Sequence, residues 1–282
     1  MRWLITGGGG QLATQAEAQL RASGDDVLVL TIDDLDITDA AAVDATVAAA
    51  RADVVVNAAA YTAVDAAETD EATAAAVNDH AAGHLATAVA AHGGRLLHVS
   101  TDYVFGGDAD RPYEVDDLPA PRTAYGRTKL AGEIRVRAAL PDRGHVVRTA
   151  WVYGGPTGNF VDTMRRLERE RDTVTVVNDQ IGNPTWARDL ATGLIELGRA
   201  DVPGGTLHYV NSGQTSWYEL AREVFRLSGA DPDRVRPIDS ASYTFATPRP
   251  AWSVLSTQAW KAAGLTPPRP WQDALAEHLG AG

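Results

Sequence analysis

The sequence predicts an α/β fold in which a doubly wound parallel sheet is followed by a smaller C-terminal lobe. Four short apolar segments, separated by alanine-rich stretches with helical spacing, read as strands at residues 3–5, 27–30, 54–56 and 96–99. A run of four glycines follows the first of them after one residue, Thr6. After residue 148 the alternation gives way to turn-rich segments. Strands that alternate with helices pair in parallel through right-handed crossovers, which is why this pattern sets the fold class.

The elements expected in the first part of the chain are, in order, a strand at Trp3–Ile5, a turn at Gly7–Gly10, a helix at 11–22 and the three further strands. Later helices are expected at about 159–170 and 216–227. We therefore expect a first domain over residues 1–150 and a second lobe over 151–282. Part of the second segment should return to the sheet.

The composition is globular, with 282 residues of which 45% are hydrophobic and 22% charged. The absence of cysteine excludes disulfides, thiolate nucleophiles and iron–sulfur ligation. A net charge of −12 opposes binding to nucleic acid or to an anionic membrane. No apolar run reaches the ~20 residues of a membrane helix, and the glycines come too early for a signal peptide. We therefore expect a cytoplasmic protein, monomeric or homodimeric, with no nucleic-acid or membrane partner.

The glycine run Gly7–Gly10 lies where backbone can approach a pyrophosphate and helix N–H groups can bind it. Its spacing, Gly-x-x-Gly-x-x-Ala ending at Ala13, departs from the G-x-G-x-x-G pattern. The second strand ends at Thr31 without the carboxylate or the arginine that would select NAD or NADP, although three aspartates follow soon after. The turn predicts a dinucleotide-binding, Rossmann-type first domain and leaves the coenzyme open.

A candidate catalytic group follows the fourth strand. Thr101 comes at the carboxyl end of that strand, where open α/β sheets place their sites. Tyr125 and Lys129 are four residues apart, so on a helix they share one face. The 25 basic residues include only two lysines, which makes a lysine at this position informative. For carbonyl reduction, Thr101 would polarise the ketone, Tyr125 would supply the proton, and the ammonium of Lys129 would lower the pKa of the phenol.

Together these residues give the chain a resemblance to the extended short-chain dehydrogenases/reductases and, within them, to the dTDP-4-dehydrorhamnose reductases. The resemblance runs through almost the whole chain. The segments that carry it are Val55–Asp65, Ser100–Phe105, Arg148–Gly154, Asn159–Phe160, Asn178–Thr185, Ser216–Glu219 and Arg249–Ser253.

The resemblance implies reduction of the 4-keto group of dTDP-4-dehydro-β-L-rhamnose to dTDP-β-L-rhamnose, with NADPH or alternatively NADH as coenzyme. It implies that Tyr125 is the proton donor and that Lys129 assists it and holds the nicotinamide ribose. Coenzyme-binding residues would be Gly7, Gly10, Gln11, Leu12, Asp36, Ile37, Ala60, Tyr61 and Thr62, with Tyr125 and Lys129. Substrate-binding residues would be Val64, Thr101, Asp102, Tyr103, Tyr125 and Trp151.

Several positions have two readings. Thr62, Asp65 and Glu68 can be helix-capping residues, while Trp151 can be a core residue or can stack on a sugar. Arg249 can bind a diphosphate or serve the structure alone. No metal site is expected, because His80 and His84 share a helical face without a third ligand.

Two other functions remain open at this point. The first is reduction of a different dTDP-4-keto sugar, suggested by Thr31–Ile32, where relatives often carry Asp-Arg, and by the divergent segment 231–245. The second is a noncatalytic, nucleotide-binding regulatory subunit, against which the intact Thr101, Tyr125 and Lys129 argue.

Overall fold

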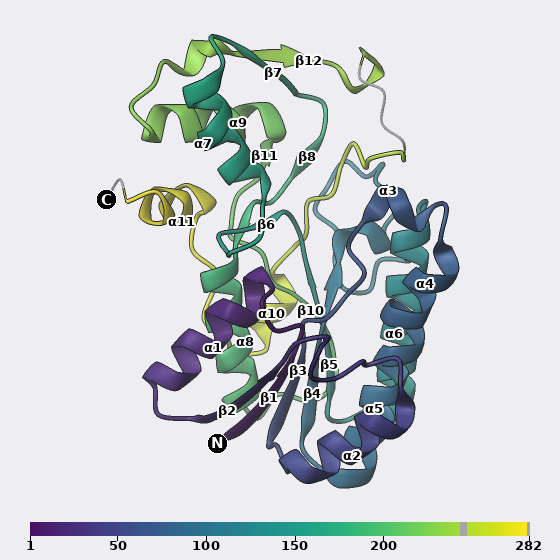
Figure 1. Cartoon of the computed structure of the whole chain (residues 1–282). Coiled ribbons are helices and arrows are strands. Elements are labelled where there is room, and N and C mark those ends of the chain that lie inside the picture. Colours follow the sequence, from purple (N-terminus) through teal and green to yellow (C-terminus); the bar gives the residue numbers. More distant parts are fainter. Residues whose placement is uncertain (243–246, 281–282) are drawn as a thin grey trace.

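The computed structural model describes residues 1–242 and 247–280, so the end of the divergent segment 231–245 lies outside the described residues. Among the described residues, six parallel strands form a central sheet in the order β10-β5-β4-β3-β1-β2 (Figure 1). Their bounds are β1 (Arg2–Thr6), β2 (Asp26–Leu30), β3 (Val54–Asn57), β4 (Arg95–Thr101), β5 (Gly144–Thr149) and β10 (Gly205–His208). The predicted doubly wound parallel sheet is confirmed.

The strand order reverses beside β1, which pairs with β2 on one side and with β3 on the other. In sheets of this kind the crevice at such a reversal, beyond the carboxyl ends of the strands, holds the ligand. The site can therefore be located from the topology alone.

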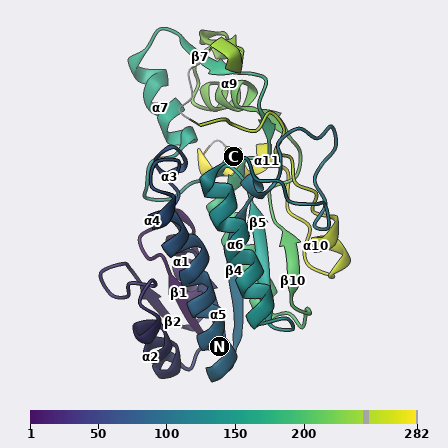
Figure 2. The same cartoon turned by 90° about the vertical axis from the view of Figure 1, so that its right-hand side faces the viewer.

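Helices cover both faces of the sheet. One face packs against α1 (Gln11–Ala22), α8 (Ala187–Arg199) and α10 (Gln258–Ala262). The other packs against α2 (Ala40–Ala50), α5 (Ala81–His92) and α6 (Ala124–Ala139), and Figure 2 shows α5 and α6 in front of β4 and β5. Alternating strand residues such as Leu96 and Leu97 serve the two cores separately, as the strands of a sheet buried on both faces must.

Short elements surround the carboxyl edge of the sheet. They are α3 (Val64–Ala67), α4 (Glu71–Ala75), the π-helical turn η1 (Ala76–His80), which joins α4 to α5, and the 3₁₀ turn η2 (Asp102–Val104), which follows β4 directly. None of them was predicted as a separate element, because a segment of three to five residues is too short to show a periodic pattern of apolar residues.

A second lobe stands above the carboxyl edge of the sheet (Figure 1). Its elements are β6 (Val152–Tyr153), α7 (Phe160–Glu170), β7 (Val174–Val177), β8 (Ile181–Gly182), β9 (Thr185–Trp186), β11 (Thr215–Ser216), α9 (Trp217–Leu227), η3 (Pro232–Arg234), β12 (Val235–Ile238), η4 (Ser240–Ser242) and α11 (Trp271–His278). Helices α7 and α9 lie where the sequence predicts them, with Asn159 and Ser216 as their N-caps. Between them the chain passes through α8 and returns to the sheet at β10. The division at residue 150 stays a prediction.

Across residues 1–242 and 247–280, no helix combines the length and the apolar character that crossing a membrane requires.

Candidate active site

A cavity of about 1330 Å³ opens at the carboxyl edge of the sheet, and residues from the second lobe complete its wall. Every residue to which the sequence assigned a site role lines it: Gly7, Gly10, Gln11, Leu12, Asp36, Ile37, Ala60, Tyr61, Thr62, Val64, Thr101, Asp102, Tyr103, Tyr125, Lys129 and Trp151. Residues from widely separated parts of the chain thus meet in one place. Their individual roles remain predictions.

The glycine turn forms one end of the cavity and fits a pyrophosphate. Gly7 has φ +83°, and a Cβ there would lie 2.7 Å from the backbone of Ala58 beyond β3, so only glycine suits this close approach. Helix α1 begins at Gln11 with Gly10 as its N-cap, and the N-cap offers no side chain to the first turn. Because the first N–H groups of a helix have no intrahelical acceptor, they are available to an anion here.

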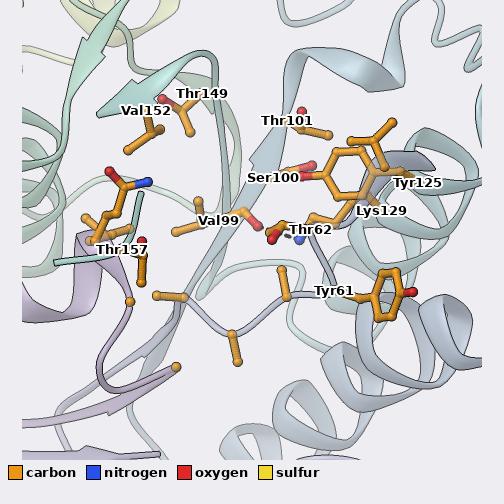
Figure 3. A pocket seen from close by; sticks show the side chains of 18 of the residues that line it. Tyr61, Thr62, Val99, Ser100, Thr101, Tyr125, Lys129, Thr149, Val152 and Thr157 are labelled. Carbon is orange, nitrogen blue, oxygen red and sulfur yellow. Dashed lines mark hydrogen bonds between the residues drawn. The ribbon is translucent and has the colours of Figure 1, made fainter. Parts of the chain in front are cut away.

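The catalytic candidates come from the end of β4 and the first turns of α6 (Figure 3). Lys129 is 2% exposed, and its Nζ donates a hydrogen bond of 2.7 Å to the carbonyl oxygen of Val99. Thr101 Oγ1 donates to Asp102 Oδ1 at 2.8 Å. The ring of Tyr125 meets that of Tyr103 edge-on, with 5.5 Å between centroids.

The start of α6, which orients Tyr125, is capped twice. Thr123 Oγ1 accepts a hydrogen bond from the amide of Gly126 at 3.0 Å. The carboxylate of Glu68 accepts one from the amide of Ala124 at 2.7 Å. Glu68 is therefore a capping residue as the sequence suggested, but it caps α6 and not its own helix α3, whose N-cap is Ala63.

Burial determines the protonation states of the candidate residues. Burial lowers the pKa of Lys129 to about 8, and the negative charge of Glu133 opposes this change. Burial raises the pKa of Tyr125 to about 12, although the hydrogen bond with Thr101 has the opposite effect and lowers it. Burial also raises the pKa of Asp102 to about 6. At neutral pH, Tyr125 thus carries its proton and most Lys129 side chains carry a positive charge.

The direction of the change in the Tyr125 pKa differs from the one predicted from the sequence. We expected the ammonium of Lys129 to lower it. In the structure this ammonium donates to the carbonyl of Val99, and burial of the phenol, with the nearby charge of Asp102, raises the pKa of Tyr125. A raised pKa suits a group that has to deliver a proton.

The end of the cavity beside β2 is formed partly by Thr31, Ile32 and Asp36. The Asp34 carboxylate accepts hydrogen bonds from the Thr31 amide at 2.9 Å and from its hydroxyl at 2.7 Å. A carboxylate therefore does lie beside the end of the strand, supplied by a tight turn three residues later. The Asp36 carboxylate is similarly bound, by the amide and hydroxyl of Thr38.

The loop after β3 is held by Asn78, which lies in the π-helical turn η1. Asn78 Oδ1 accepts from the Tyr61 amide at 2.9 Å, and Nδ2 donates to the Tyr61 carbonyl at 3.1 Å and to Thr128 Oγ1 at 3.2 Å. The ring of Tyr61 points away from the catalytic group (Figure 3). Gly132 of α6 faces the same π-helical turn. A Cβ at this position would lie 2.1 Å from the carbonyl oxygen of Asn78, so the absence of a side chain lets α6 pack closely against η1. π-helical turns are frequent at functional sites.

Trp151 connects the two lobes in an unusual backbone conformation, with φ +48°. Its indole stacks on that of Trp217 from α9 with 3.6 Å between ring centroids, and Phe160 of α7 packs against Trp217 in turn. Protein therefore already covers one face of Trp151. A sugar can use only the remaining face and the ring edges.

Other residues line the cavity without having been assigned a role in it. From the second lobe they include Thr157, Phe160, Val176, Val177, Gln180 and Trp217. Thr149, at the end of β5, also belongs here, since its buried hydroxyl has no hydrogen-bond partner among the residues described. Phe160, Gln180, Trp217 and Thr149 lie in segments that carry the family resemblance, but the sequence assigned them no individual role. Apolar residues such as Val176 and Val177 look like core residues until the fold turns them toward a cavity.

The structure shows the surroundings of Arg249 and His84, two positions for which the sequence allowed more than one role. Arg249 lines the cavity, where its Nη2 donates to Asp65 of α3 at 2.8 Å. His84 Nδ1 lies 3.4 Å from the carbonyl oxygen of Ile37. In the described part of the chain, no three His, Asp or Glu side chains gather in a way that could hold a metal ion.

A glycine turn at a strand reversal, together with Thr101 at the end of β4 and with Tyr125 and Lys129 on α6, defines an extended short-chain dehydrogenase/reductase. A family model described as the RmlD substrate binding domain matches residues 1–281. The chain belongs to this family, that of the dTDP-4-dehydrorhamnose reductases.

The similar proteins include enzymes acting on more than one dTDP-sugar. The dTDP-4-dehydrorhamnose reductase of Mycobacterium tuberculosis is 51% identical over 99% of this chain and 93% of its own. The dTDP-4-keto-6-deoxy-D-glucose reductase of Streptomyces niveus is 46% identical over 98% of this chain and 96% of its own. A crystal structure of the Bacillus anthracis dTDP-4-dehydrorhamnose reductase in complex with NADP is 34% identical, with a TM-score of 0.95 over 100% of this chain and 99% of that one.

Proposed function

We propose that this protein reduces the 4-keto group of dTDP-4-dehydro-β-L-rhamnose to give dTDP-β-L-rhamnose, with NADPH as coenzyme. The observation that carries the proposal is the meeting of Thr101, Tyr125 and Lys129 with the glycine turn in a single cavity. Membership of the family and the similarity to the M. tuberculosis enzyme support the choice of sugar.

When bound, the nicotinamide supplies the hydride that reduces C4 of the sugar. Tyr125 donates its phenolic proton to the ketone oxygen as negative charge develops there. The ammonium of Lys129 stabilises the phenolate left behind. The Thr101 hydroxyl, which now donates to Asp102, turns to the same oxygen and polarises it. One hydride on carbon and one proton on oxygen convert the ketone to the alcohol.

Backbone amides and cavity-lining side chains of this chain would hold the coenzyme. The amides at the start of α1, around Gln11 and Leu12, would bind the pyrophosphate. Lys129 would contact the nicotinamide ribose, and Ala60 and Thr62 would line the same end. Asp36 and Ile37 would line the adenosine end, beside Thr31.

The second lobe would hold the nucleoside diphosphate of the substrate. Phe160, Val176, Val177 and Trp217 make an apolar, partly aromatic wall, which suits a thymine ring. Arg249 brings a positive charge to the wall, which suits a diphosphate. Val64, Asp102, Tyr103 and Trp151 would surround the sugar between these groups and Tyr125.

The predictions about cellular location, oligomeric state and nucleic-acid binding belong to this proposal as well. We propose action in the cytoplasm, as a monomer or a homodimer, without a nucleic-acid partner. The net charge of −12 supports the last point.

A coupled assay tests the proposed reaction. dTDP-4-dehydro-L-rhamnose is produced enzymatically from dTDP-glucose, the protein is added with NADPH or NADH, and nicotinamide absorbance is followed. We expect coenzyme oxidation with this sugar and much slower oxidation with other dTDP-4-keto sugars. If another keto sugar reacts faster, as the similarity to the S. niveus enzyme would then suggest, the choice of sugar is wrong. If none reacts while the upstream enzymes are active, the reductase proposal fails.

A further inference from the structure

A buried ion pair lies directly behind the catalytic group. Glu133 is on α6, one turn beyond Lys129, and Arg148 is on β5; the two residues are 2% and 3% exposed. Arg148 donates from Nε and Nη2 to the two carboxylate oxygens of Glu133, at 2.9 and 2.7 Å. Ser100 Oγ donates to the same carboxylate at 2.5 Å. The carboxylate therefore joins α6 to both β4 and β5.

Helix α6 in this way contacts three consecutive residues at the end of β4. Lys129 binds the carbonyl of Val99, and Glu133 binds the hydroxyl of Ser100. Tyr125 shares a hydrogen bond with Thr101. These contacts come from successive turns of a single helix face, so the relative placement of Thr101, Tyr125 and Lys129 depends on all three.

The same carboxylate also determines the balance of charge around Lys129. Lys129 and Arg148 are both buried cations, and Glu133 lies within reach of both. Burying an ion without a counter-charge is costly, so two cations around one carboxylate make Glu133 indispensable to both. An ion pair that served the fold alone would require neither the bond to Ser100 nor a place one turn from Lys129.

We infer that Glu133 is a positioning residue for the reduction: it holds the end of β4 through Ser100 and supplies the negative charge that keeps Lys129 protonated. This inference rests on the proposed function. Glu133 is not among the described residues that line the cavity, whereas Ser100 and Lys129 are, so it acts through these two residues.

The ionisable groups that face this cluster leave Glu133 as the effective counter-charge. On α6 itself, Tyr125 stays neutral because burial raises its pKa to about 12. From β4, burial and the charge of Lys129 hold the pKa of His98 well below its usual range, so His98 is neutral too. Beside Arg148, burial lowers the pKa of His208 to about 3. Asp102, whose pKa burial raises to about 6, is directed to Thr101.

The chain allows a direct test, since Lys129 and Lys261 are its only lysines. With lysine labelled by ¹³C at Cε, NMR should show two resonances, assigned through Lys261→Arg. In the unsubstituted protein the Lys129 resonance should titrate near pH 8. The resonance of exposed Lys261 serves as an internal reference for the spectra. In Glu133→Gln we expect the Lys129 titration to move about one unit lower.

Kinetics give the second readout. For Glu133→Gln the alkaline limb of kcat/KM should move to lower pH in parallel with the Lys129 resonance, whereas Glu133→Asp should keep its position and lose only part of kcat. The matched control is Glu71→Gln, which removes a carboxylate paired with Arg127 on the surface and should move neither readout.

Two further variants cover the case in which Glu133→Gln does not fold. Ser100→Ala leaves the ion pair intact and should lower kcat without moving the Lys129 titration. Glu133→Gln combined with Arg148→Gln removes both buried charges, and the Lys129 titration should still move lower. An unchanged Lys129 titration in a folded Glu133 variant overturns the inference, as does an equal loss of activity at every pH. Because the NMR titration needs no turnover, this failure is distinct from failure of the proposed reaction.

Discussion

At the scale of single residues, the proposed chemistry depends most on one phenol. Tyr125→Phe removes the proton donor and keeps the ring that meets Tyr103. We expect kcat to fall by roughly 10²–10⁴-fold, as for loss of a general acid, with the dissociation constant of NADPH little changed. Steady-state kinetics and fluorescence titration with NADPH measure the two quantities. Near-normal turnover by Tyr125→Phe would remove Tyr125 from the mechanism.

The pH dependence of the reaction should report Lys129. Burial lowers its pKa to about 8, so the cation that assists Tyr125 is present below this value and is lost above it. We therefore expect kcat/KM for reduction to be nearly level around neutral pH and to fall as the pH rises through about 8. A profile that stays level to pH 10 would show that the positive charge on Lys129 is not needed.

Single residues also show what the sequence can reveal. The four-residue spacing of Tyr125 and Lys129 predicts a shared helix face, because helix geometry is local. Nothing local predicts that Glu133, a charged residue in the same helix, is buried, because this depends on Arg148 arriving from β5. The pKa of Tyr125 was predicted in the wrong direction for a similar reason, since burial is a property of the whole fold.

At the scale of elements, the π-helical turn η1 holds the loop that lines the coenzyme end of the cavity. Asn78→Ala would leave the amide and carbonyl of Tyr61 without their partner. We expect a loss of about 1–3 kcal/mol in the free energy of unfolding and a higher KM for NADPH. Denaturant titration and kinetics measure these. His80→Ala, an exposed residue of the same turn, should change neither; equal effects from the two variants would contradict a specific role for Asn78.

Elements with a clear period or cap were the ones the sequence predicted well. Helix α1 occupies the predicted residues, and α7 and α9 begin directly after the residues that cap them. The turn η1 was not predicted. A π-helical turn amounts to one extra residue in a continuous helix, and in an alanine-rich segment this insertion hardly changes the pattern of apolar residues. The capping of α6 by Glu68 is a contact between distant segments, for which no short-range signal exists.

At the scale of the whole molecule, charge should govern the choice of coenzyme. Among the described residues that line the cavity, the basic side chains are Lys129, at the catalytic centre, and Arg249, paired with Asp65. Neither of these basic side chains lies at the end of β2, where the 2′-phosphate of NADPH would be recognised. Without a charge-assisted hydrogen bond, worth about 1.5–3 kcal/mol, NADPH and NADH should differ less than about tenfold in kcat/KM. A much larger preference for NADPH would reveal a phosphate-binding group elsewhere.

The arrangement of the two lobes explains why a fold predicted from sequence does not yield the complete site. The glycine turn and the catalytic strand end lie on the sheet, whose topology follows from the alternation of strands and helices. The wall formed by Phe160 and Trp217 comes from the second lobe, where the apolar pattern gives no direction. The stacking of Trp217 on Trp151 depends on contact between the lobes.

The measurement that tests the central claim most directly is transfer of deuterium from reduced coenzyme to the sugar. The protein is incubated with dTDP-4-dehydro-L-rhamnose and NADPH carrying deuterium at the transferable C4 position, and the product is examined by NMR and mass spectrometry. We predict dTDP-L-rhamnose with one deuterium at C4 of the sugar, and almost no product with Tyr125→Phe. A product without deuterium, deuterium at another carbon, or a sugar of different configuration at C4 would contradict the account.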